Sequence, residues 1–117
     1  MRRAVVILAL SFPLAAEAET RCGWLSNPTP ANYWLQDADG EWTLSIQGIG
    51  DRDSGFYDAP WADAPSDWWI ETNGSYGYGC ACFEGVVDVE TRWAVKVTSV
   101  TPLPLNRCLQ DPALPSR

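Results

Sequence analysis

The sequence contains no histidine and a single lysine, Lys96. Histidine is the commonest general base and a frequent metal ligand, so its absence removes the usual route to acid–base catalysis. A hydroxyl nucleophile would need Lys96 as its base, and Lys96 falls on the predicted outer face of a strand. Glycosidases use pairs of carboxylates, but among 15 acidic residues some pairs are unavoidable. Their presence therefore does not indicate a glycosidase. We expect a non-catalytic protein without a cofactor.

The sequence also lacks an apolar run long enough to span a membrane. Its most apolar stretch, residues 4–15, is short and contains a proline. This stretch follows two arginines and precedes a small-x-small sequence at residues 16–18, which is the pattern of a secretory signal peptide. We expect residues 1–18 to be removed and residues 19–117 to form one exported domain, periplasmic or secreted, with no membrane span.

Four cysteines remain after that cut, namely Cys22, Cys80, Cys82 and Cys108. An even number in an exported chain predicts disulfides, whereas a zinc site would need CxxC or Cys/His pairs that are absent. Cys80 and Cys82 stand two apart on a predicted strand, with Cα atoms about 7 Å apart, too far to bridge each other without distortion. Each then pairs with Cys22 or Cys108. Of the two possible pairings we prefer Cys22–Cys82 with Cys80–Cys108, because Cys108 follows a strand whose end should lie beside Cys80.

The Cys80-Ala81-Cys82 motif has an alternative interpretation as a redox or copper-binding pair. That role would need a free partner and an activating neighbour.

Two acidic motifs, at residues 37–40 and 51–55, resemble the first half of a calcium loop. Neither continues to the second-half carboxylate of an EF-hand, and Asx-Gly turns give the same pattern. We expect no metal site.

Charge is distributed unevenly along the chain. Without residues 1–18 it carries 6 basic and 14 acidic residues, a net charge of −8, and residues 37–71 alone account for −8. Such a surface repels phosphate backbones, which argues against nucleic acid as a partner, and attracts a basic protein or a cation. The plainer interpretation is an acidic surface that keeps the protein soluble.

Alternation of apolar and polar residues with period two predicts short strands. The five predicted strands are residues 33–36, 41–47, 68–72, 75–83 and 92–100. The first two flank an Asp-Gly turn and predict a hairpin. If Leu35 lies opposite Trp42, Leu35 joins the apolar face, and a slip of one residue would reverse this. In the last strand Trp93, Val95 and Val97 are expected to point inward.

Two proline-containing segments, residues 22–30 and 102–105, are expected to be an extended entry segment and the end of strand pairing. In the fourth strand Gly77 and Gly79 leave one face nearly bare, which predicts that an indole ring lies across it. The fold class that follows is all-β and mainly antiparallel. We expect a small disulfide-stapled sheet or partly open barrel of about five strands, with one long acidic-aromatic loop.

That loop, residues 48–66, has no sustained period, and long loops of this kind tend to be functional. A short helical turn is possible at residues 61–67. Seven tryptophans are difficult to bury in so small a domain, so some should reach the surface, where aromatic rings mark recognition sites. The candidate binding residues are Asp53, Phe56, Tyr57, Asp58, Trp61, Asp63 and Trp68.

These residues favour a monomeric binding or inhibitor-like module for a basic envelope protein, with the aromatic rings as anchors and the aspartates as steering charges. The alternative is a carbohydrate- or peptidoglycan-binding module in which exposed indoles stack on sugar rings. A third interpretation is that the loop only covers the glycine-bearing face of the sheet as a lid.

Several motifs together resemble a known family. They are residues 21–24 (RCGW), 27–30 (NPTP), 34–42 (WLQDADGEW), 76–82 (YGYGCAC) and 102–105 (PLPL) before Cys108. In combination they resemble a four-cysteine, tryptophan-rich family of small exported bacterial proteins described only as a domain of unknown function. The resemblance covers essentially the whole predicted mature chain. It implies a Gram-negative periplasmic or secreted setting and supplies no activity or site residues.

Overall fold

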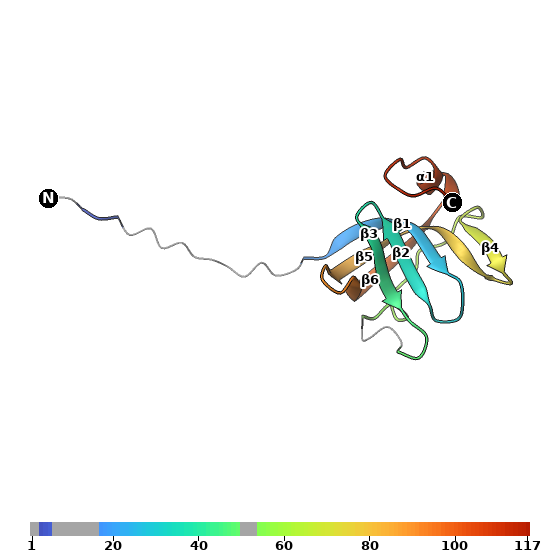
Figure 1. Cartoon of the computed structure of the whole chain (residues 1–117), viewed down its shortest axis with the longest axis horizontal. Coiled ribbons are helices and arrows are strands. Elements are labelled where there is room, and N and C mark those ends of the chain that lie inside the picture. Colours follow the sequence, from blue (N-terminus) through green and yellow to red (C-terminus); the bar gives the residue numbers. More distant parts are fainter. Residues whose placement is uncertain (1–2, 6–16, 50–53) are drawn as a thin grey trace.

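The computed structural model describes residues 3–5, 17–49 and 54–117 (Figure 1). Within these residues six strands and one short helix form an all-β domain, which confirms the predicted fold class. The elements are β1 (Glu19–Asn27), β2 (Tyr33–Asp37), β3 (Gly40–Ser45), β4 (Trp69–Asn73), β5 (Tyr76–Asp88), β6 (Trp93–Leu103) and α1 (Leu105–Leu109). In this part of the chain no helix is long and apolar enough to cross a membrane.

Five of the strands close into an irregular ring. β1, β2 and β3 are antiparallel neighbours, and β5 returns to lie beside β1, which makes a Greek key. β6 pairs with β5 and closes the ring against β3 through one parallel pair, Thr43 with Trp93. β4 pairs with the first residues of β5, on the part of the edge that β6 does not reach. Among the described strands β4 pairs with β5 alone.

The predicted hairpin is confirmed in β2 and β3. Leu35 lies opposite Trp42, and both are buried, because the period-two pattern places them on the inner face. Gly40 closes the turn with φ +126°, a conformation that favours glycine. The Oδ1 atom of Asp37 accepts a hydrogen bond from the backbone N–H of Asp39 at 2.9 Å, so the acidic motif here is an Asx turn.

The segment expected as an extended entry is instead a full strand, β1, and this accounts for the sixth strand. It pairs with β5 along all nine residues and with β2 at its end. Gly23, Trp24 and Leu25 are buried in succession. No alternation was visible because both faces of β1 are covered: Leu25 joins the barrel core, and Trp24 packs outside under the C-terminal segment.

β6 differs from its predicted pattern. Val95 is 54% exposed and Ala94 is buried, the reverse of the expectation. The register explains the difference, since Lys96 pairs with Val86 and Ala94 with Val87, which leaves Val95 as an extra, bulged residue. The bulge shifts the register by one residue, so the residues before it exchange faces. Beyond it Val97 is buried and Thr98 is exposed, as predicted.

β6 also continues further than expected. The proline segment at residues 102–105 does not end the pairing at its first residue, because Pro102 still lies opposite Ala81 and Leu103 opposite Cys80. The strand therefore delivers α1 directly beside β5.

Two disulfides have the preferred connectivity. Cys22 and Cys82 are register partners on β1 and β5 and are bridged across the two strands. Cys80 is bridged to Cys108 of α1, and the two pack with Trp24 in a second buried cluster outside the barrel. The indole N–H of Trp24 donates to the carbonyl of Pro115 at 3.0 Å, so the C-terminal segment seals this cluster.

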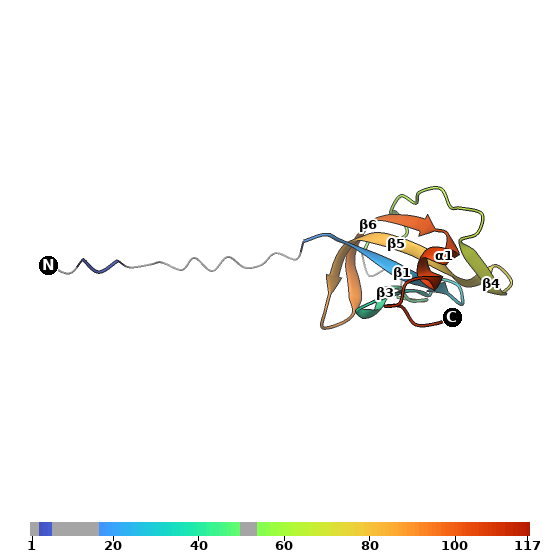
Figure 2. The same ribbon diagram turned by 90° about the horizontal axis from the view of Figure 1, so that it is seen from above.

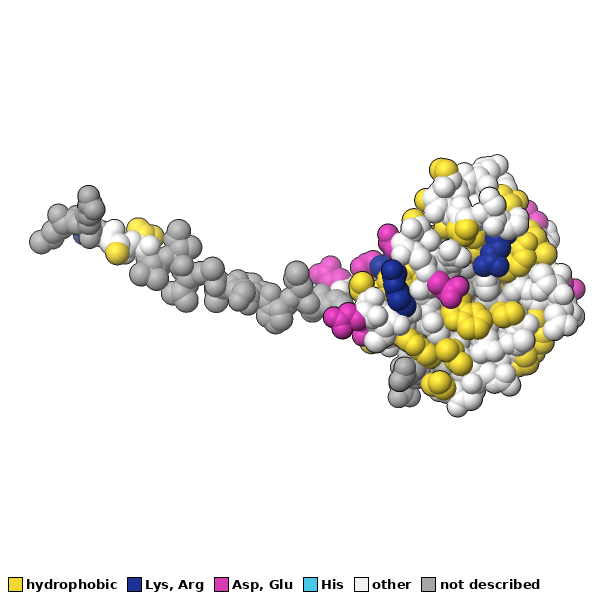
Figure 3. Space-filling view, in the orientation of Figure 1, with side chains coloured by type: hydrophobic (Ala, Val, Ile, Leu, Met, Phe, Trp, Pro, Cys, Tyr) yellow, Lys and Arg dark blue, Asp and Glu magenta, His cyan; other side chains and the backbone are white. Residues whose placement is uncertain are grey.

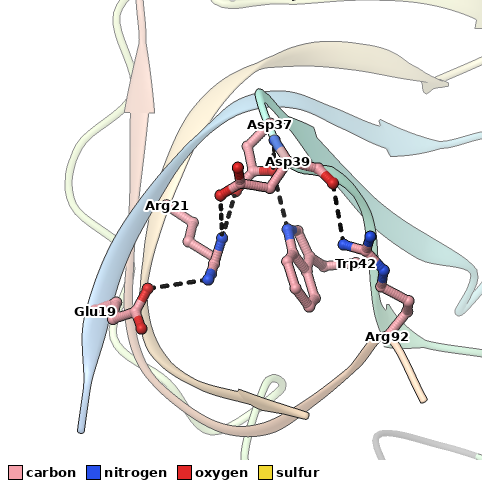
Figure 4. A network of polar contacts seen from close by, with 6 residues as sticks. All are labelled: Glu19, Arg21, Asp37, Asp39, Trp42 and Arg92. Atoms are coloured by element: carbon pink, nitrogen blue, oxygen red, sulfur yellow. Dashed lines mark hydrogen bonds and ion pairs between the residues drawn. The ribbon is translucent and has the colours of Figure 1, made fainter. Parts of the chain in front are cut away.

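One end of the barrel is closed by a stacked cation–aromatic network (Figure 4). The buried ring of Trp42 lies between two guanidinium groups, with the Cζ atoms of Arg21 and Arg92 4.2 and 4.6 Å from the ring centroid. Arg21 donates to Asp37 at 2.9 Å and to Asp39 at 3.2 Å. Burial lowers the pKa of Arg21, but these carboxylates outweigh it and the net shift is upward. The two carboxylates are thus engaged by arginine.

Candidate functional site

The acidic-aromatic segment, residues 54–68, leads from the predicted loop to β4 and follows the open edge of β6. The N–H of Val97 donates to the carbonyl of Ser54 at 2.7 Å, and the N–H of Val100 to that of Pro60 at 3.0 Å. Trp61 forms an isolated parallel bridge with Val100, in place of the helical turn considered at residues 61–67. Figure 2 shows the segment arching past β6 before it enters β4. These hydrogen bonds occupy the edge of β6, whereas the lid considered above would cover the glycine-bearing face of β5.

The aromatic residues predicted to be anchors differ in how far their side chains are buried. Phe56 is only 2% exposed and belongs to the barrel core, with its ring 4.8 Å from that of Tyr33. Its assignment as a surface anchor is therefore wrong, since a ring that fills the core cannot meet a partner. Tyr57 and Trp61 are 53% and 41% exposed, and Trp68 is half-buried. Asp58 and Asp63 are exposed, whereas Asp53 lies outside the described residues.

Three indoles form a row beside the segment. The ring centroids of Trp61 and Trp68 are 6.2 Å apart, and those of Trp68 and Trp69 are 4.8 Å apart. They line an open groove of about 430 Å³, a volume within the range of small-ligand sites. The groove is lined by Asn27, Tyr33, Trp61, Trp68, Trp69, Glu71 and Ser75.

Five of these lining residues were missed from the sequence: Asn27, Tyr33, Trp69, Glu71 and Ser75. A signal for Trp69 was present, because the Asn-Gly turn predicts that the strand of Trp69 pairs with the glycine-bearing strand. In the structure Trp69 lies opposite Gly79, and the predicted indole over the bare face is confirmed. Asn27 and Tyr33 come from β1 and β2, and no local pattern connects them to the groove.

Gly79 makes room for the row of indoles. A Cβ atom built there would lie 2.6 Å from Cε3 of Trp69 and 2.9 Å from Cε3 of Trp68. It would also collide with the backbone carbonyl of Trp68, which the fold cannot move freely because that oxygen accepts a hydrogen bond from the N–H of Cys80 at 3.1 Å. The glycine is therefore needed for a close approach.

We expect Gly79→Ala to destabilise the domain by about 1–3 kcal/mol, because two rings and a carbonyl must shift. Urea denaturation would measure the loss, and tryptophan emission would report the displaced rings. Ser75→Ala, an exposed change in the same groove, is the control and should stay within about 0.5 kcal/mol of the parent. Equal stability of Gly79→Ala and the parent would contradict the close packing.

The polar side chains of the groove differ in their hydrogen bonds and in their protonation. The side-chain amide of Asn27, 7% exposed, donates to the carbonyls of Thr29 at 2.9 Å and Asn32 at 2.8 Å. The indole N–H of Trp69 donates to the carbonyl of Ser75 at 3.1 Å. Burial raises the pKa of Tyr33, with a smaller contribution from Tyr57, so its hydroxyl stays protonated.

Acidic side chains are exposed on the segment, and another, Glu71, lines the groove. Asp58, Asp63, Asp67 and Glu71 are all exposed, and the ion pairs of the described residues all belong to Arg21 at the barrel end. Figure 3 shows a similar imbalance on the face of Figure 1, where acidic side chains gather near the N-terminal segment and basic ones stand singly. The described part of the chain contains no group of acidic or cysteine residues that could hold a metal ion.

Comparison with known proteins gives one match. The family model described as "Protein of unknown function (DUF4087)" matches residues 16–115. Neither the curated proteins nor the solved structures contain a match.

Proposed function

We propose that this chain, which belongs to the DUF4087 family of proteins of unknown function, is an exported, non-catalytic binding module for a basic protein. Its two disulfides, with no free cysteine, suit an oxidising compartment such as the periplasm or the exterior of the cell. A basic envelope enzyme that it inhibits is the first partner to look for.

A single observation carries this proposal: exposed aromatic rings and carboxylates that form no ion pair with a described residue occur on one segment. Tyr57 and Trp61 offer large apolar area, and Asp58 and Asp63 flank them. Aromatic anchors inside a polar rim are the usual anatomy of a protein interface. Asp58 and Asp63 form no ion pair within the described residues, although Lys96 lines the same hollow as Asp58. Carboxylates without an ion pair raise the association rate with a basic partner and favour it over an acidic one.

The test is capture of partners from an envelope extract at low salt and at about 0.5 M salt, where charges are screened within a few ångströms. We expect a basic protein that binds at low salt and is released at high salt. The double variant Asp58→Asn/Asp63→Asn should slow its association, and Trp61→Ala should speed its dissociation, each by about tenfold. The control Glu84→Gln/Glu90→Gln removes the same charge from exposed sites on β5 and in the β5–β6 turn. A partner whose affinity changes neither with salt nor with Trp61→Ala would refute the proposal.

A second candidate is a glycan, because an open row of indoles with adjacent hydrogen-bonding side chains also suits sugar rings. Peptidoglycan fragments should then change tryptophan emission with little dependence on salt. A flat response across a panel of fragments would exclude this candidate.

A further inference from the structure

We propose that the groove beside the acidic-aromatic segment receives one arginine side chain of the partner. This inference rests on the proposed function and names the group that the site recognises. The guanidinium would lie against the indoles of Trp61, Trp68 and Trp69, with its N–H groups directed to Asn27 and Glu71.

The argument begins with the hydrogen-bonding capacity of Asn27. A side-chain amide has two N–H donors, and those of Asn27 are both taken by the carbonyls of Thr29 and Asn32. These two acceptors fix the orientation of the amide, so Oδ1 is the atom left for the groove. Asn27 is more than nine-tenths buried, and no described residue donates a hydrogen bond to Oδ1. This oxygen is nevertheless accessible, because Nε of Arg21 is the one fully buried side-chain polar atom without a partner among the described residues. An accessible acceptor at the groove can take a hydrogen bond from a ligand that supplies a donor.

Glu71 adds an ionised acceptor at the same groove. Its carboxylate is exposed on β4, and in the described part of the chain it has no ion pair. Asn27 and Glu71 thus present acceptors and no donors. A ligand with several N–H donors and a positive charge satisfies both residues at once.

The indoles that line the groove favour a planar ligand. Indole faces attract cations, and a guanidinium is planar, weakly hydrated and able to stack while it donates in its own plane. The molecule already uses this combination at the barrel end. There Arg21 stacks on Trp42 at 4.2 Å and donates to the carboxylate of Asp37 at 2.9 Å (Figure 4).

Size is consistent with a single inserted side chain. A groove of about 430 Å³ lies near the lower end of the volumes found for small-ligand sites. It has room for one extended side chain and its terminal group, and not for a folded element. The rest of the partner would then lie outside the groove, where the exposed Asp58 and Asp63 of the segment are available to it.

The experiment uses the disulfide-intact protein and short probes of defined chemistry. Acetyl-Gly-Arg-Gly-amide is compared with the same peptide carrying citrulline, which has a similar shape and no charge, and with the lysine peptide. An N-acetylglucosamine oligomer serves as the glycan probe. Tryptophan emission and calorimetry measure binding. We expect the arginine peptide to bind about tenfold more tightly than either the citrulline or the lysine peptide.

The variants separate the groove from the rest of the surface. Glu71→Gln and Trp61→Ala should each weaken the arginine peptide by about tenfold, whereas Trp61→Phe should retain most of the affinity because it keeps an aromatic face. Glu84→Gln, an exposed acid on β5 outside the groove, should have no effect. Thermal denaturation of each variant confirms that it is folded.

Several outcomes would overturn the inference. Equal binding of the arginine and citrulline peptides would show that charge is not recognised, and equal binding of lysine would exclude stacking of a guanidinium. Preference for the glycan probe would replace the basic partner by the second candidate. If a basic protein is captured as proposed above while the arginine peptide neither binds nor competes with it, the inference fails and the proposed function stands. If neither binds, both fail.

Discussion

Loss of both disulfides is expected to unfold the domain near 37 °C. The Cys22–Cys82 bridge spans 60 residues and the Cys80–Cys108 bridge spans 28. Loop-closure entropy assigns them about 4 and 3.5 kcal/mol respectively, and their sum is comparable with the whole stability of a small domain. The reduced protein should therefore be protease-sensitive where the oxidised protein resists.

Mass spectrometry and limited proteolysis would check this expectation. Oxidised protein should contain no free thiol and should yield cross-linked peptides for Cys22–Cys82 and Cys80–Cys108. Proteins that lack one bridge, Cys22→Ser/Cys82→Ser and Cys80→Ser/Cys108→Ser, serve as the controls and should lose part of the stability. A fully reduced protein that keeps its protease resistance would contradict the estimate.

The two bridges should also differ in how readily they are reduced. Cys22 is exposed, whereas Cys80 and Cys108 are 1% and 4% exposed. A reductant must reach a sulfur to attack it, so the Cys22–Cys82 bridge should open first in the folded protein. Alkylation of mildly reduced protein would then label Cys22 and Cys82 before the other pair.

Asp37→Ala is expected to cost about 3–5 kcal/mol, the second largest effect. Asp37 is 8% exposed and accepts hydrogen bonds from Arg21 at 2.9 Å, from the indole of Trp42 at 3.0 Å and from the N–H of Asp39 at 2.9 Å. Its removal leaves a partly buried guanidinium and two other donors without their acceptor.

Asp39→Ala is the matched control, because Asp39 contacts the same arginine. Its side chain is 72% exposed, so solvent screens the pair and the loss should stay below about 1 kcal/mol. Asp37→Asn, which keeps an acceptor oxygen, should fall between the two. Urea denaturation of the three variants measures the ranking. Equal losses for Asp37→Ala and Asp39→Ala would show that burial of Asp37 contributes nothing.

Sequence alone was sufficient where the controlling interactions are local. The β2–β3 hairpin follows from the alternation around an Asp-Gly turn, and the β4–β5 hairpin from Asn-Gly. The spacing of Cys80 and Cys82 excluded a bridge between them, which left two pairings, and the structure has the preferred one. The bare face at Gly79 predicted the covering indole. Each inference needed only the pleat of one strand or the geometry of one turn.

Tertiary structure decided the features that depend on contacts between distant segments. β1 is covered on both faces, by the barrel core and by residues near the C-terminus, so its sequence shows no alternation. The bulge at Val95 is set by the register against β5 and cannot be read from β6 alone. Phe56 and Trp61 belong to the same segment, yet the first fills the core and the second remains 41% exposed, because only the packed barrel defines which ring finds space inside.

The candidate site illustrates the same division. Composition identified an acidic, aromatic segment, because charge and ring content are properties of the chain itself. The groove needs Asn27 from β1, Tyr33 from β2 and Glu71 from β4, which are separated by many residues and meet only when the ring of strands closes. Whether the amide of Asn27 presents a donor or an acceptor depends on two carbonyls of the β1–β2 turn. The residue types of the segment could therefore be predicted from the sequence, whereas the lining of the groove arises from strand pairing.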